Sequence, residues 1–205
     1  MNSIFDKIIF IHCKHRLDRY QNIQNFIKKF NLTNYYILEA TYLPNNGAKG
    51  CSHSHYRAMQ YCLDNQLNNV LILEDDYYID TNIDEINSKL EKIFSIEIWD
   101  VIMLDWSLNA VEKRSIKIND DLRKVIHHRY GASLTSAYAV NKSLFVILKD
   151  IFLQSYNKLD DVYNHSQKHC KTDAIWHSLQ KNYQWFIVLP KIGNQNQSKS
   201  DIHCW

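Results

Sequence analysis

The sequence lacks the features that mark membrane, secreted and nucleic-acid-binding proteins. No apolar run approaches the roughly 18 residues of a membrane-spanning helix, and the run near the N-terminus is too short for a secretory signal. Five cysteines are odd in number and widely scattered, which argues against a disulfide framework. The 24 Lys and Arg side chains balance 22 Asp and Glu, so no basic surface for nucleic acid is indicated. We expect a cytoplasmic protein without a transmembrane segment, either free or peripheral at a membrane.

Glycine and proline are also scarce, at four and two residues, and the chain shows no internal repeat and no interior linker. Hydrophobic residues make up 45% of the 205 and charged residues 22%, which is typical of a globular protein. This length suits one domain with a full hydrophobic core better than two. We expect a single domain over residues 1–205.

Short apolar segments alternate with segments of helical periodicity. The predicted strands are residues 8–11, 35–38, 70–73, 99–106, 133–140 and 185–190. The first predicted helix follows the basic turn of residues 14–19 and has Ile23, Phe26, Ile27 and Phe30 on one face. The other predicted helices follow Gly50, with Ser52 or Ser54 as cap, and cover 83–94, 143–153 and 172–180. Residues 44–50 indicate a turn, and residues 107–130 a loop with one short edge strand. This alternation predicts an α/β fold with a central, mostly parallel sheet flanked by helices on both faces.

Three acids stand directly after the apolar run of residues 70–73, namely Glu74, Asp75 and Asp76. In α/β sheets ligands bind at the carboxyl ends of strands, which is where these acids fall. Alternation along an extended chain sends Glu74 and Asp76 to one side and Asp75 to the other. Clustered carboxylates suit Mg²⁺ or Mn²⁺, whereas the plainer interpretation is a solvated turn after a strand.

A zinc site was also considered, because Cys51, His53, His55 and Cys62 lie close together in the sequence. They lack the C-x2-C and H-x3-H spacings of structural zinc sites. Small buried thiols and histidines at the start of a helix explain them better.

The segment GCSHSHYRAMQYCLDNQLNNVLILEDD, residues 50–76, resembles the central signature of glycosyltransferase family 25. This family includes bacterial lipooligosaccharide galactosyltransferases and animal procollagen galactosyltransferases. Further similar segments follow in the family's order, so that the resemblance spans nearly the whole chain. They are IFIHCKHRLDR, WDVIMLDW, TSAYAV, TDAIW and the closing Pro190, Gln195 and Ser200 to Ile202.

The resemblance implies a GT-A type, Rossmann-like nucleotide-sugar-binding domain that uses Mn²⁺ or Mg²⁺. It implies a UDP-sugar donor, UDP-galactose ahead of UDP-glucose, and transfer with inversion to a saccharide or to hydroxylysine in a collagen-like protein. An alternative is a catalytically silent nucleotide-sugar or glycan-binding module on the same fold. A third is a metal-dependent phosphohydrolase that uses the same acids, which leaves the C-terminal motif unexplained.

The resemblance also assigns residues to the nucleotide and the metal. Asp76 is expected to bind the metal directly, with Asp201 and His203 as further ligands from the tail. Glu74 and Asp75 are expected to contact metal-bound water or the uridine ribose. The remaining donor-site candidates are Arg16, Arg19, His12, Ser54 and His55.

Several of these assignments carry alternatives. Arg16 and Arg19 are expected to contact uracil or phosphate, because guanidinium groups suit such oxygens. His12 stands where the family usually has Asn, and it either keeps a hydrogen bond to the nucleotide or loses that contact. His55 either holds the loop beside the metal or is a structural histidine in the first helical turn.

Asp173 is the expected catalytic base, which would take a proton from the acceptor hydroxyl. The alternative is that Asp173 merely caps a short helix. Trp176 follows it and could stack on a sugar ring. Trp106 and Tyr138 either line the sugar pocket or pack in the core.

Overall fold

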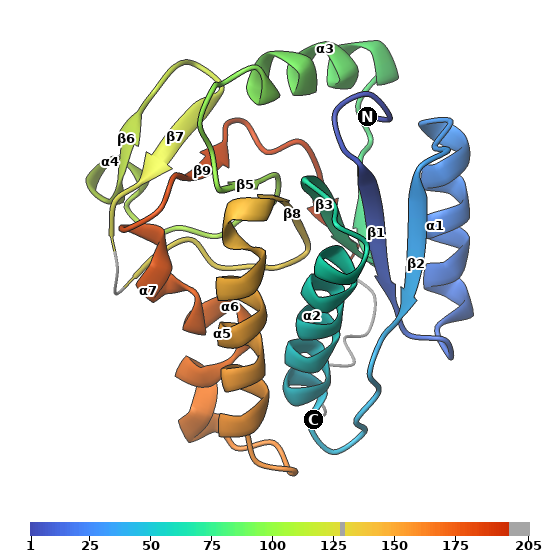
Figure 1. Cartoon of the computed structure of the whole chain (residues 1–205), viewed down its shortest axis with the longest axis vertical. Helices are drawn as coiled ribbons and strands as arrows, with labels where there is room; N and C mark the ends of the chain where they lie inside the picture. The colour runs from blue at the N-terminus through green and yellow to red at the C-terminus, as the bar shows by residue number, and fades with distance from the viewer. Residues whose placement is uncertain (128–129, 197–205) are drawn as a thin grey trace.

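The computed structural model describes residues 1–127 and 130–196, and its centre is an eight-stranded sheet (Figure 1). Six strands run in one direction, and β8 and β7 run in the other. The α/β prediction is therefore confirmed. In spatial order the strands are β2 (Tyr35–Glu39), β1 (Lys7–His12), β3 (Asn69–Glu74), β8 (Ala137–Asn141), β5 (Val101–Met103), β9 (Trp185–Val188), β7 (Leu122–Val125) and β6 (Ser115–Lys117).

Helices cover both faces of the sheet, as the uninterrupted apolar strands predict. Alternate strand residues enter different clusters: Ile8 and Phe10 pack with helices α1 (Leu17–Lys29) and α3 (Ile83–Phe94). Ile9 and Ile11 pack on the other face, with helices α2 (Gly47–Asp64) and α5 (Phe145–Lys158). The last two helices lie side by side across that face (Figure 1).

The smaller elements differ more from the sequence-based prediction. Residues 107–130 contain two strands, β6 and β7, where one edge strand was expected; β7 lies inside the sheet, and its Arg123 is buried by pairing with Ser115 and Glu112. The predicted helix 172–180 is divided at Trp176. The remaining short elements are α4 (Val111–Arg114), η1 (Lys142–Leu144), η2 (His165–Cys170), α6 (Thr172–Ile175), α7 (His177–Gln180), β4 (Tyr77–Tyr78) and β10 (Asn194–Gln195). None of the helices in the described ranges combines the length and the apolar character of a membrane span.

Helix α2 begins earlier than expected. Its N-cap is Asn46, whose side-chain oxygen accepts a hydrogen bond from the backbone N–H of Lys49 at 3.1 Å. The prediction of a cap at Ser52 or Ser54 is wrong, because both serines lie inside the helix. Their hydroxyls donate to carbonyls four residues earlier, a role open to serine in mid-helix.

The chain order creates a crevice at the carboxyl ends of β1 and β3. Strand β1 lies between β2 and β3. The loop after β1 leads to α1 on one face of the sheet, whereas the loop after β2 leads to α2 on the other face, so these two loops diverge. The C-terminal part returns to this place, because β10 pairs antiparallel with β4, immediately after the three acids. Gly193 makes this approach possible: a Cβ atom there would collide with the carbonyl oxygen of Tyr78.

Candidate active site

A pocket enclosing about 650 Å³, part of it open to solvent, lies at the carboxyl ends of β1 and β3. One wall is acidic and another is apolar, a combination that suits a ligand with charged and uncharged parts. The lining residues are Ile11, Cys13, Arg19, Ala40, Thr41, Tyr42, Leu43, Gly47, Cys51, Ser54, His55, Glu74, Asp75, Asp76 and Gln195.

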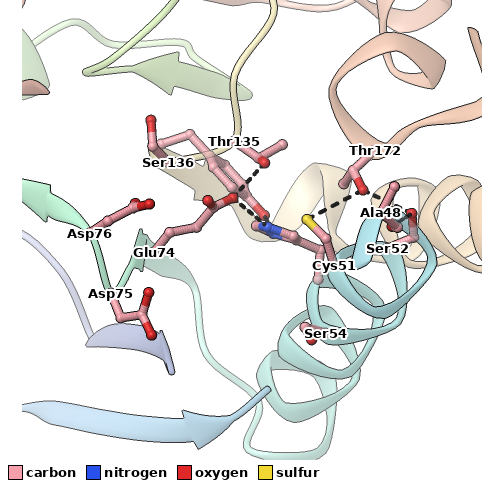
Figure 2. Close-up of polar contacts among 12 residues, drawn as sticks. Ala48, Cys51, Ser52, Ser54, Glu74, Asp75, Asp76, Thr135, Ser136 and Thr172 are labelled. Atoms are coloured by element: carbon pink, nitrogen blue, oxygen red, sulfur yellow. Dashed lines mark hydrogen bonds and ion pairs between the residues drawn. The ribbon is translucent and has the colours of Figure 1, made fainter. Parts of the chain in front are cut away.

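Glu74 is held rigidly at the end of β3 (Figure 2). Its Oε1 accepts a hydrogen bond from the hydroxyl of Thr135 at 2.6 Å and lies 3.2 Å from Nε2 of His55. The other ring nitrogen of His55 lies 2.9 Å from the hydroxyl of Tyr138, and both of these side chains are fully buried. Burial opposes ionisation of Glu74, but the hydrogen bonds and the nearby His55 outweigh it, so its pKa is lowered. Glu74 is thus a fixed, ionised carboxylate.

Asp75 points away from its two acidic neighbours (Figure 2), in keeping with the alternation expected of an extended segment. Its Oδ2 lies 2.9 Å from Nδ1 of His12 and accepts from the backbone N–H of Cys13 at 3.0 Å. Its Oδ1 accepts from Arg19 at 2.8 Å. These three contacts use both oxygens of a buried carboxylate to fix the turn that follows β1.

Asp76 is the acid whose contacts are least complete. It is 9% exposed, and its Oδ1 has no hydrogen-bond partner within the described part of the chain. Its Oδ2 lies 3.2 Å from Nη1 of Arg19. Burial, and after it the charge of Glu74, raises the pKa of Asp76 to about 7. A buried carboxylate with an unpaired oxygen, facing a second carboxylate, fits a hard divalent cation.

Of the other donor-site candidates, Arg19, Ser54 and His55 line the pocket, whereas Arg16 and His12 do not. Arg19 lines it, but Arg16 forms a two-point ion pair with the exposed Asp18, with N–O distances of 2.9 and 2.7 Å. Ser54 lines the pocket and fixes the preceding loop, because its hydroxyl accepts from the backbone N–H of Thr41 at 2.8 Å. The roles of Arg16, Arg19, His12, Ser54 and His55 toward a nucleotide stay predictions.

Three further predictions concern the tail and the base. Asp201 and His203 lie outside the described residues. Asp173 is half-buried at the start of α6, next to Thr172, whose hydroxyl donates to the Cys51 sulfur at 3.6 Å. Its negative charge acts on Cys51, a pocket residue, and on His177. Asp173 is therefore close to the pocket wall, and its role as base stays a prediction.

The aromatic side chains proposed for sugar contact are largely structural. Trp176 is fully buried, with its ring edge-on to Tyr138 and Trp185, and its indole N–H donates to the carbonyl of Ala132. The stacking expectation for Trp176 is therefore wrong. Tyr138 likewise belongs to the core, although its hydroxyl supports His55.

Sequence reasoning assigned no role to three residues that complete the site. The hydroxyl of Thr135 donates a hydrogen bond to Glu74. The preceding residue, Leu134, has a backbone φ of 81°, which is unusual for a residue other than glycine. Gln195 comes from the returning chain end and contacts Asp76. Cys51 lines the pocket beside His55. A signal existed for all three, because Cys51, Thr135 and Gln195 each belong to a segment that carries the resemblance.

Cys51, His55 and Glu74 offer ligand atoms that lie within 4.8 Å of one another. Cys51 and His55 are four residues apart on one face of α2, a spacing other than the zinc patterns tested in the sequence. Burial, followed by the charge of Glu74, raises the pKa of the Cys51 thiol well above its usual value. Mn²⁺ and Mg²⁺ prefer carboxylate oxygens to sulfur, so the predicted cation fits Glu74 and Asp76 better than this cluster, and its binding there stays a prediction.

Comparison with known proteins agrees with this geometry. The sequence profile of glycosyltransferase family 25 (LPS biosynthesis protein) matches residues 14–174. No curated protein sequence matches the chain. A similar solved structure is a glycosyltransferase involved in the glycosylation of the major capsid of PBCV-1, with 12% identity, TM-score 0.53, and coverage of 88% of this chain and 80% of that chain. Another is a UDP-glucose pyrophosphorylase complexed with UDP-glucose, with 10% identity, TM-score 0.50, and coverage of 93% and 74%.

These structural likenesses concern the fold, which is the predicted GT-A type α/β arrangement. The profile match covers well over half of the chain and includes the first helix, the Gly-Cys and Ser-His motifs, the three acids and Asp173. The chain therefore belongs to glycosyltransferase family 25 and is a glycosyltransferase.

Proposed function

We propose that this glycosyltransferase depends on Mn²⁺ or Mg²⁺ and transfers galactose or glucose from a UDP-sugar, with inversion, to a hydroxyl group. The observation that carries the proposal is the buried carboxyl of Asp76, whose Oδ1 lacks a partner in the described residues and which faces Glu74. A divalent cation would satisfy that oxygen and would neutralise the repulsion between the two acids.

Different residues of the pocket would bind the cation and the phosphates of the donor. Asp76 and Glu74 would hold the cation, with Glu74 kept in position by Thr135 and His55. When bound, the cation would stabilise the charge that develops on the departing diphosphate. Arg19 is already in the pocket and would add positive charge beside the phosphates, while Asp75 keeps it in place.

Asp173 is proposed as the general base. In an inverting transfer the acceptor oxygen attacks the anomeric carbon as the bond to UDP breaks, and the acceptor proton passes to a carboxylate. Asp173 is half-buried and its charge reaches Cys51 in the pocket wall, so a carboxylate is available near the crevice. UDP would leave on the side of Glu74 and Asp76.

The acceptor is proposed to be a saccharide, and a hydroxylysine of a collagen-like protein is the second possibility. The description of the family as an LPS biosynthesis protein favours the saccharide. A nucleotide-sugar donor is supported by the fold likeness to a UDP-glucose pyrophosphorylase. UDP-galactose is placed ahead of UDP-glucose by the resemblance to galactosyltransferases alone.

The test is UDP release from a panel of UDP-sugars by the purified protein, with Mn²⁺, with Mg²⁺ and with chelator. We expect slow, metal-dependent hydrolysis of UDP-galactose or UDP-glucose, and its loss in Asp76→Asn. Asp150→Asn, an exposed acid on α5, is the matched control and should behave as wild type. Absence of turnover with every donor and acceptor, combined with tight UDP binding, would favour the catalytically silent module instead.

A further inference from the structure

Two aromatic rings, those of Tyr42 and His15, contact each other where the loops after β2 and β1 meet beside the pocket. Tyr42 lines the pocket and yet is 52% exposed. Its ring centroid is 4.3 Å from that of His15, which is also exposed, with 54° between the ring planes. A large aromatic side chain that is exposed beside a pocket is more often a binding surface than a contribution to stability.

The loop that carries Tyr42 is fixed to helix α2. The backbone N–H of Thr41 donates to the Ser54 hydroxyl at 2.8 Å, and the Thr41 hydroxyl lies 2.8 Å from Nδ1 of His53. Gly50 lets the two segments touch, because a Cβ atom there would collide with the carbonyl oxygen of Thr41. Thr41, the residue before Tyr42, is thus anchored through its backbone and its side chain, so the Tyr42 ring is presented with little loss of conformational entropy on binding.

The turn that carries His15 is fixed in a different way. The backbone N–H of Cys13 donates to the buried carboxylate of Asp75, and the N–H of Arg16 donates to the carbonyl of Cys13 at 2.8 Å. The His15 turn follows β1 and the Tyr42 loop follows β2, which are neighbouring parallel strands. The two rings therefore come from two preformed loops at the same edge of the sheet.

The position of the rings relative to the acids indicates which part of a ligand they meet. The sheet order β2-β1-β3-β8 puts Tyr42 on one side of the acids and Thr135 on the other. Thr172, the neighbour of Asp173, bonds to the Cys51 sulfur, which lies within 4.8 Å of the Glu74 carboxylate that Thr135 holds. The proposed base therefore lies on the Thr135 side. A UDP-sugar held at its diphosphate by Glu74 and Asp76 would direct its sugar toward Asp173 and its base toward Tyr42.

We infer that the exposed face of the Tyr42 ring, supported by His15, stacks on the uracil base of the donor nucleotide. This inference rests on the proposed function, since it takes the diphosphate to bind at the acids. Ile11, Ala40 and Leu43 form the apolar lining next to Tyr42, which suits the flat face of a base better than a phosphate.

The test is calorimetric binding of UDP and of inorganic pyrophosphate, each with Mn²⁺, to wild type, Tyr42→Ala and Tyr42→Phe. Pyrophosphate carries the metal-binding groups without a base. Stacking on an aromatic ring predicts that Tyr42→Ala binds UDP roughly 5- to 150-fold more weakly. Pyrophosphate binding should stay unchanged, and Tyr42→Phe should bind UDP as wild type does. Tyr36→Ala is the matched control, because that 36% exposed ring stacks on Tyr61 outside the pocket lining.

Each other outcome overturns the inference in a distinguishable way. Unchanged UDP binding by Tyr42→Ala refutes base stacking and leaves the proposed function intact. An equal loss of pyrophosphate binding shows that Tyr42 acts on the metal end. Failure of the wild type to bind UDP refutes the proposed function together with this inference.

Discussion

Replacing Asp76 by Asn should stabilise the metal-free protein at alkaline pH, because it removes the negative charge of a buried carboxylate. The pKa of Asp76 is raised from 3.8 to about 7, so the folded state holds a proton that the unfolded chain releases at lower pH. Wild-type stability therefore falls as the pH rises from about 4 to about 7, and above that window the whole cost of ionisation is present. Asn cannot ionise and does not incur this cost.

The size of the effect follows from the shift. Each pKa unit corresponds to about 1.36 kcal/mol, so a shift of about three units gives roughly 4 kcal/mol as an upper figure. The Asn side chain still lacks a full set of partners beside Arg19, which costs about 1 kcal/mol. We expect Asp76→Asn to raise the free energy of unfolding by roughly 2 to 4 kcal/mol at pH 8 and to change it little at pH 5.

Urea unfolding at pH 5 and pH 8, with chelator and with Mn²⁺, measures both parts of the argument. With Mn²⁺ at pH 8, the difference in free energy of unfolding between Asp76→Asn and wild type should shrink or change sign. The reason is that the ion stabilises wild type by about 2.7 kcal/mol at one hundred times its dissociation constant. The Asp76→Asn variant should lose most of that gain. Equal stability of the two proteins at pH 8 in chelator would show that ionisation of Asp76 does not destabilise the fold. An equal stabilisation of the two proteins by Mn²⁺ would show that Asp76 is not a metal ligand.

Three further substitutions test the support of the site. His55→Ala removes a hydrogen bond from the half-buried Glu74 and leaves a cavity in place of a fully buried ring, so the free energy of unfolding should fall by about 2 to 4 kcal/mol and donor turnover by about tenfold or more. Gly50→Ala forces its new methyl group against the carbonyl of Thr41, at a cost of about 1 to 3 kcal/mol in urea unfolding. Trp176→Ala empties a fully buried site and should cost about 3 to 5 kcal/mol, with the KM for donor unchanged in the folded fraction.

Each of these has a contradicting result. His165→Ala, which changes an exposed histidine of η2, is the control for His55→Ala, and equal turnover in the two variants would remove His55 from the site. A Gly50→Ala protein of normal stability would mean that the loop after β2 can move away from α2 without cost. A raised KM in Trp176→Ala, at full stability, would restore Trp176 as a sugar contact.

Most of the sheet could be predicted from the sequence because its strands are uninterrupted apolar runs between helical segments. Residues 70–73 and 185–188 are recognisable in this way, and both form central strands. Strand β7 was missed since its sequence, Leu-Arg-Lys-Val, looks polar; Arg123 enters the interior only through partners contributed by other segments. Such compensation depends on tertiary contacts, which local patterns do not contain.

The same distinction between local pattern and tertiary contact applies to the candidate site. The position of the three acids at a strand end could be predicted, since strand ends converge in α/β sheets. Their different environments could not. Asp75 is saturated by His12, Cys13 and Arg19, whereas Asp76, one residue later, keeps an oxygen without a partner in the described residues. These differences arise from long-range packing, and adjacent identical letters in a sequence give no sign of them.

Strand β8 runs opposite to both of its neighbours, β3 and β5, and lies between them in the described sheet. The residues just before it bond outward in both directions, Thr135 to Glu74 and Ser136 to Asp105 at 2.7 Å. A displacement of β3 relative to β5 would therefore strain the hydrogen bonds of Glu74 and of Asp105 together. Two adjacent residues just before β8 thus fix one acid on each side of this strand, Glu74 at the end of β3 and Asp105 after β5.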